Sequence, residues 1–224
     1  MKTPQEIYNC LDETLKEYKK PVTELSKTDE NYFIKDETLM FDWDAISELN
    51  DGDESSSVDA VYCSFENNEL ILYFFEFKNI NFYDTFFDAK KQLEDVISDL
   101  EKCVFCCGYP HKIKKIKRKL VSKRLISLKT KPLESLILLN EILQSEGIKP
   151  EELVNIKKEY YIVSKTPINT NKSNYHRKGR TGEIFGFIDK IKPFPFIKVE
   201  PITEETFISL INNLERKNEI PLNN

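Results

Sequence analysis

Three residues of this chain, Asp59, Glu76 and Lys78, have the side chains that metal-assisted hydrolysis needs. Two carboxylates that face each other repel, and a sheet normally avoids such a pair. A hard cation between them would remove the repulsion, and Mg²⁺ takes one or two carboxylates while keeping several waters. A lysine beside the metal could orient or deprotonate one of those waters. The three residues therefore predict a magnesium site if the fold brings them together.

A β-hairpin would bring these residues together. Residues 58–66 and 69–78 are rich in β-branched and aromatic side chains, which favours strands. Asn67-Asn68 between them tolerates the left-handed backbone of a two-residue turn. This turn places Asp59 opposite Glu76, with their β-carbons about 5 Å apart. Because side chains alternate along a strand, Lys78 shares the face of Glu76. The rest of this face is predicted to be apolar: Val61, Cys63, Phe65, Leu70, Leu72 and Phe74.

An Asp, a turn and then Glu-x-Lys on the next strand resemble the core motif of the PD-(D/E)XK nuclease superfamily. Here the motif reads Val58-Asp59 and Glu76-Phe77-Lys78, with Val58 in place of the family's Pro. The resemblance implies a restriction endonuclease-like α/β core and metal-dependent hydrolysis of phosphodiester bonds in DNA. It also implies that Asp59, Glu76 and the backbone carbonyl of Phe77 hold Mg²⁺ or Mn²⁺, while Lys78 positions the attacking water. An ordinary amphipathic hairpin with charged ends is the alternative.

The resemblance also assigns candidates on two helices. A helix is predicted over 85–102, directly after the Glu-x-Lys strand, where the family places one that often carries a Gln or Lys facing the site. Gln92 is the candidate for the catalytic group, with Lys91 beside it, although Gln92 could also lie at the margin of the sheet. An acid of the first helix, Glu13 or Glu17, could reach the metal, but a solvated helix face explains both.

The charges of the chain are strongly segregated although its net charge is only −5. Residues 24–69 contain fourteen Asp or Glu and two Lys, whereas residues 111–131 contain ten Lys or Arg and no acid. The basic segment keeps helical spacing, and a second basic stretch lies in the polar loop 165–181. Both suggest contacts with DNA phosphates. A solvated helix balanced by the acidic region and a plain surface loop are the alternatives. The candidate DNA-binding residues are Lys114, Lys115, Lys117, Arg118, Arg177, Lys178 and Arg180.

The composition fits a globular domain, with 40% hydrophobic and 32% charged residues over 224 positions. No apolar run is long enough to span a bilayer, and the opening MKTPQEIYNC lacks the apolar core of a signal peptide. Five Cys form no recognisable disulfide framework, which suits reduced thiols. We therefore expect a cytoplasmic protein without membrane contact.

The remaining segments predict a single α/β domain over 1–224 with a central mixed sheet and a helical insert at about 103–157. Asp42 and Asp44 flank Trp43 as a second acid pair or, as we expect, as surface charge on an edge strand. Residues 50–57 predict a loop. Helices are predicted over 4–19, 133–145, 150–157 and 203–217, and further strands over 32–34, 39–43, 159–164 and 195–200.

The leading hypothesis is a Mg²⁺-dependent deoxyribonuclease, which could form a homodimer. A catalytically inactive nuclease-fold module that binds DNA or a protein partner is the alternative. An interaction protein that uses its charge asymmetry is a third hypothesis.

Overall fold

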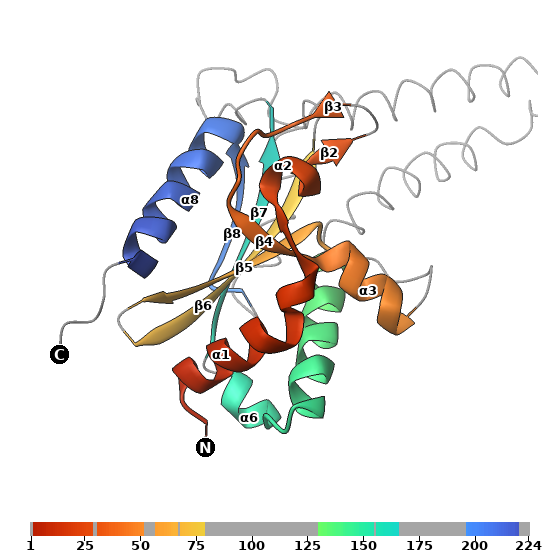
Figure 1. Cartoon of the computed structure of the whole chain (residues 1–224), viewed down its shortest axis with the longest axis vertical. Coiled ribbons are helices and arrows are strands. Elements are labelled where there is room, and N and C mark those ends of the chain that lie inside the picture. Colours follow the sequence, from red (N-terminus) through yellow and green to blue (C-terminus); the bar gives the residue numbers. More distant parts are fainter. Residues whose placement is uncertain are drawn as a thin grey trace, which may run out of the picture.

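The computed structural model describes residues 2–28, 31–51, 57–66, 68–78, 130–154, 156–165 and 196–219. Within these ranges the chain forms an α/β fold in which helices pack against a mixed six-stranded sheet (Figure 1). None of the helices in this part of the chain is long and apolar enough to cross a membrane.

The sheet has the strand order β1-β4-β5-β6-β7-β8. The first four strands pair antiparallel with their neighbours, whereas β6, β7 and β8 run parallel. A separate two-stranded sheet pairs β2 with β3. The bounds are β1 Lys19–Pro21, β2 Lys27–Thr28, β3 Asn31–Tyr32, β4 Leu39–Asp42, β5 Ala60–Glu66, β6 Glu69–Lys78, β7 Lys157–Ser164 and β8 Lys198–Thr203.

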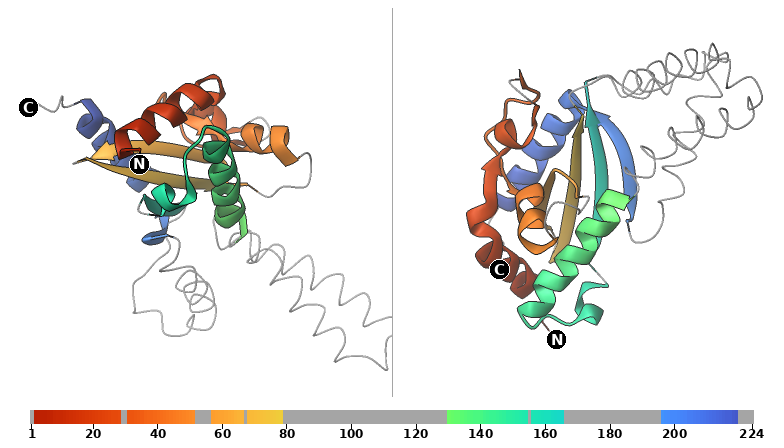
Figure 2. Two further views of the ribbon diagram at one scale, coloured as in Figure 1. Left: turned by 90° about the horizontal axis from the view of Figure 1, so that it is seen from below. Right: turned by 90° about the vertical axis from the view of Figure 1, so that its right-hand side faces the viewer.

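Helices cover both faces of the sheet and form two apolar cores. The helices are α1 Pro4–Leu15, which continues as the 3-10 turn Lys16–Tyr18, α2 Val22–Leu25, α3 Trp43–Asp51, the helical residues 130–145, α6 Pro150–Leu153 and α8 Glu204–Glu219. One core joins α1, α3, residues 130–145 and α6 to the sheet face of Phe74. The other joins α2 and α8 to the face of Phe75. Figure 2 shows residues 130–145, in green, beside α1 and α3, and α8, in blue, apart from them.

The predicted hairpin is confirmed, including its register. β5 and β6 pair from Glu66↔Glu69 to Ala60↔Phe75, and Asn68 has a φ of 65°, the left-handed backbone that the turn requires. β6 is buried on both faces along most of its length. It lies between β5 and β7 in the sheet, and helices pack on each of its two faces. Successive side chains of β6 therefore point into one apolar core and then the other. A charged residue in this strand, such as Glu76, is buried whichever face it lies on.

The segment after β4 differs from the prediction. The strand expected over 39–43 ends at Asp42, and Trp43–Asp51 is helical, so residues 50 and 51 belong to a helix and not to the expected loop. The Oδ1 atom of Asp42 accepts a hydrogen bond from the backbone N–H of Ala45 at 3.1 Å, which caps the start of α3. Asp42 is also buried, with 8% exposure, so its prediction as surface charge was wrong.

Threonine side chains cap the starts of two helices, and a glycine follows the end of a third. Thr3 and Glu6 form a capping box at the start of α1, and Thr203 accepts from the backbone N–H of Thr206 at the start of α8. Gly147, with a φ of 76°, ends the helical residues 130–145. The helix predicted over 150–157 stops at Leu153 because β7 begins at Lys157, and the last strand lies three residues later than expected.

Several predictions concern residues outside the described ranges. These are the helix over 85–102 with Gln92, most of the basic segment 111–131 and most of the loop 165–181. From the expected insert at about 103–157, residues 130–145 and α6 contribute Leu139, Leu143 and Leu153 to the core that contains Phe74.

Candidate active site

Asp59 is held in place by backbone groups of strand β6 and of the start of helix α3. It lies immediately before β5, and its Oδ2 atom accepts a hydrogen bond from the N–H of Phe77 in β6 at 2.5 Å. Its backbone carbonyl accepts from the N–H of Trp43, at the start of α3, at 3.2 Å. The carboxylate therefore has a fixed orientation before any ligand binds, with its Oδ1 atom left to face other groups.

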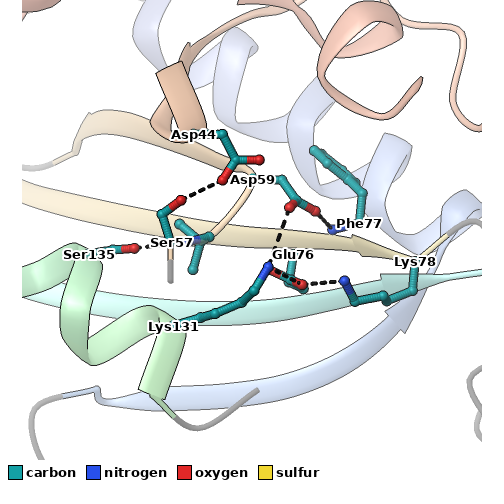
Figure 3. A network of polar contacts seen from close by, with 9 residues as sticks. Asp44, Ser57, Asp59, Glu76, Phe77, Lys78, Lys131 and Ser135 are labelled. Carbon is teal, nitrogen blue, oxygen red and sulfur yellow. Dashed lines mark hydrogen bonds and ion pairs between the residues drawn. The ribbon is translucent and has the colours of Figure 1, made fainter. Parts of the chain in front are cut away.

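The chain that leads into Asp59 is anchored on two sides. The N–H of buried Val58 donates to the Oγ atom of Ser135, at 2.9 Å, in the helical residues 130–145. The hydroxyl of Ser57 donates to the carboxylate of Asp44 in α3. Figure 3 shows the contact between Asp44 and Ser57. The helical residues 130–145 and helix α3 thus fix the backbone just before Asp59.

Glu76 is fully buried, with 0% exposure, and is paired with two lysines. Lys78, two residues further along β6, forms an ion pair with its Oε1 atom. Lys131, in the helical residues 130–145, donates to Oε1 at 2.9 Å and to Oε2 at 3.1 Å. The same Lys131 ammonium lies 3.9 Å from the Oδ1 atom of Asp59. Lys131 therefore bridges the two acids, as Figure 3 shows.

Burial decides the electrostatics of this cluster. Burial first, and the charge of Glu76 second, raise the pKa of Asp59 to about 7, against the opposing effect of Lys78 and Lys131. Burial alone would lower the pKa of Lys131, but Glu76 and Asp59 raise it, which keeps the ammonium charged. Although Asp44 is exposed, partial desolvation by its surroundings raises its pKa, against the opposing hydrogen bond from Ser57. In this cluster each buried charge is stabilised by the opposite charges beside it, so removal of one partner would leave the other uncompensated.

A tyrosine of β7 belongs to the same buried region. Burial raises the pKa of Tyr160 well above its usual value, and the charges of Glu76 and Asp59 raise it further. Among the described residues, nothing donates to or accepts from its buried hydroxyl. Buried hydroxyl groups are normally satisfied, so this one marks a place where a water or a ligand oxygen would complete the network.

The donor set fits a hard divalent cation. The two carboxylates of Asp59 and Glu76 match what Mg²⁺ takes from proteins when waters fill the remaining positions. Within the described ranges no three His, Cys, Asp or Glu side chains form a metal-binding group, so the acid pair would act with water or substrate oxygens. A metal there would have to replace the ammonium of Lys131, which now holds both oxygens of Glu76.

The structure brings together three of the residues predicted for the site and adds others. Asp59, Glu76 and Lys78 form one cluster, and Phe77 contributes its N–H to it. Glu13 and Glu17 of the first helix and its following turn are exposed, and a further acid whose charge acts on Asp59 is Asp44 of α3. Outside the described residues are Gln92, Lys114, Lys115, Lys117, Arg118, Arg177, Lys178 and Arg180.

Sequence reasoning missed Lys131, Ser135 and the Asp44–Ser57 contact. In the sequence Lys131 is simply the last cation of the basic segment 111–131. The signal that was available is the spacing of Lys131 and Ser135, four positions apart, which puts both on one face of a helix. On that face they reach the acid pair and the backbone before it.

No family model matches the chain, and no curated protein or solved structure is detectably similar to it.

Proposed function

We propose that the protein is a Mg²⁺- or Mn²⁺-dependent nuclease that hydrolyses phosphodiester bonds of DNA. The observation that carries this proposal is the fully buried carboxylate of Glu76, which shares one cluster with Asp59 and Lys78. A buried acid pair costs folding free energy, and such arrangements concentrate at sites that bind cations or perform chemistry. The mixed sheet and the confirmed hairpin register support the resemblance to the PD-(D/E)XK superfamily.

Each residue of the cluster has a role in this proposal. Asp59 and Glu76 hold the metal, with the backbone carbonyl of Phe77 as a further ligand, and the N–H of Phe77 keeps Asp59 oriented. Lys78 positions the attacking water and stabilises the charge that develops on the phosphate. A bound Mg²⁺ supplies polarisation of the phosphoryl oxygens. The basic residues of 111–131 and 165–181 hold the DNA backbone.

Cleavage assays with the full chain test this function. Wild type should nick or degrade single-stranded, duplex or branched DNA only when Mg²⁺ or Mn²⁺ is present. Lys78→Ala should abolish cleavage with little change in DNA affinity, because Lys78 acts on the water. Lys157→Ala is the matched control. Lys157 is in β7 and pairs with Glu69, which lies on the same strand, β6, as Lys78. This substitution should leave cleavage unchanged. If the wild-type protein cleaves none of these substrates with either metal, the proposal of a nuclease is refuted.

Metal binding gives a second readout. Millimolar Mn²⁺ should raise the melting temperature of wild type, since a ligand of the folded state stabilises it by mass action. Asp59→Asn removes one ligand charge and should abolish this rise. A melting temperature that does not respond to the metal argues against a shared metal site.

A catalytically inactive module that binds DNA or a protein is the second candidate. The specific observation in its favour is Lys131, whose ammonium already forms ion pairs with both acids without a metal. A permanent Lys131 bridge would make the cluster a structural ion network. The two candidates differ in whether Mn²⁺ can displace that bridge.

A further inference from the structure

Lys131 occupies the position that a metal would need, and this has consequences for how the metal binds. Its ammonium reaches both oxygens of Glu76 and faces Oδ1 of Asp59. These are the atoms that the proposed function assigns to a cation. Lys78 contacts only Oε1 of Glu76 and extends from the same strand, so it can keep its contact when another cation arrives.

The two acids and the two lysines of the cluster match in charge without a metal. With both acids ionised, Asp59 and Glu76 carry two negative charges, and Lys78 and Lys131 carry two positive charges. Asp44, whose charge also acts on Asp59 and Lys131, adds one negative charge when it is ionised. A divalent cation added to this set leaves an excess of positive charge in a buried site, which is unfavourable. The excess falls if a lysine moves away or if an anion such as a phosphodiester enters with the metal.

Lys131 is the lysine whose movement would free the metal ligands, because it contacts both oxygens of Glu76 and faces Oδ1 of Asp59. Lys78, whose side chain is 32% exposed, pairs with Oε1 of Glu76. The side chain of Lys131 is 20% exposed and ends a flexible four-carbon stem, so the ammonium can turn towards solvent without moving the helix. Ser135, on the same helix face, stays attached to the N–H of Val58 and keeps the helix docked. An ammonium released at the rim of the site is placed to contact a phosphate.

We propose that Lys131 competes with the divalent metal for Asp59 and Glu76 in the free protein and transfers its ammonium to the DNA phosphate when both bind. Metal and phosphodiester then bind with positive cooperativity, because each one removes the cost that the other would meet alone. This inference rests on the proposed function for the identity of the two ligands. The competition lowers the affinity of the free protein for the metal. Binding of the DNA phosphate, which takes up the ammonium of Lys131, raises that affinity.

Binding of Mn²⁺ to the full chain, followed by titration calorimetry or by electron paramagnetic resonance, tests the competition. Lys131→Met keeps the length of the side chain and removes its charge, so it should bind Mn²⁺ alone roughly tenfold more tightly than wild type. Lys131→Arg keeps a cation on the acids and should not show this gain. Lys157→Met removes a lysine from an exposed ion pair with Glu69 and should bind as wild type does. Melting curves establish that each variant is folded.

The cooperativity is measured with a short phosphorothioate oligonucleotide as the phosphodiester. Its presence should raise the affinity of wild type for Mn²⁺ roughly tenfold, and Lys131→Met should lose most of this increase. Wild type supplies this result even if Lys131→Met does not fold. Equal or weaker Mn²⁺ binding by a folded Lys131→Met variant overturns the proposal, and so does a wild-type affinity that ignores the oligonucleotide.

The outcomes separate this inference from the proposed function. Tighter Mn²⁺ binding by Lys131→Met in a protein that cleaves no DNA upholds the competition and refutes the nuclease. Metal-dependent cleavage by wild type together with weaker Mn²⁺ binding by Lys131→Met upholds the nuclease and refutes the competition.

Discussion

The contact between Glu76 and Lys131 can be measured as a coupling free energy. Glu76 is fully buried, and Lys131 contacts both of its oxygens at 2.9 and 3.1 Å. Removing one partner of a buried ion pair costs about 3–5 kcal/mol, because the other charge is left without compensation. Lys78 still neutralises part of Glu76, so we expect Lys131→Met to lower the free energy of unfolding by about 2 kcal/mol.

A double-mutant cycle isolates this contact from the rest of each side chain. Glu76→Gln, Lys131→Met and the double mutant are unfolded with urea at pH 8 in the presence of a chelator. We expect a coupling of about 2 kcal/mol, since the double mutant lacks both charges of the pair, whereas each single variant leaves one of them without its partner.

A second cycle, on an exposed ion pair between β6 and β7, is the control. Glu69→Gln and Lys157→Met break an exposed Glu–Lys pair at 2.5 Å, with side chains 53% and 42% exposed. Solvent screens this pair, so its coupling should be about 0.5 kcal/mol or less. Equal couplings in the two cycles would refute the reasoning that burial makes the Glu76–Lys131 pair strong.

Three further results are expected. The raised pKa of Asp59, about 7, means that the folded state keeps a proton which the unfolded chain loses near pH 4. The free energy of unfolding should therefore fall from pH 4 to 7 by at most about 1.4 kcal/mol per unit, and Asp59→Asn should flatten this slope in urea titrations. Ser135→Ala leaves the buried N–H of Val58 unpaired and should cost about 1–3 kcal/mol in the same assay; a change near zero would contradict this. Changing Lys114, Lys117 and Arg118 to Glu should weaken DNA binding and reduce its salt dependence by roughly one unit of slope per lost phosphate contact. Lower thermal stability with unchanged DNA binding would instead identify the acidic region as their partner.

The hairpin could be predicted from sequence because its information is local. The alternation of apolar residues and the Asn67-Asn68 turn fix the register, and the register alone brings Asp59 near Glu76 and puts Lys78 on the same face. Even here the ladder ends at Ala60, so Asp59 lies just beyond the pairing and is held by the N–H of Phe77.

The rest of the site depends on contacts that sequence spacing does not encode. Lys131 has the same residue type as its basic neighbours, and only the docking of residues 130–145 on the sheet distinguishes it. The start of α3 was missed because Asp42, Trp43 and Asp44 alternate as in a strand, whereas the cap from Asp42 to Ala45 favours a helix. That helix turns Asp44 towards Ser57.

The two halves of the charge cluster differ greatly in their separation along the chain. The contact between Asp59 and Phe77 spans 18 positions, and that between Glu76 and Lys131 spans 55. Short loops close at a lower entropic cost than long ones, so we expect the hairpin to bring its acid pair together before Lys131 reaches it. At this stage the carboxylates of Asp59 and Glu76 face each other with Lys78 beside them and without Lys131. Their repulsion opposes hairpin closure at neutral pH and is relieved by protonation, so refolding should be faster in mild acid than at pH 8.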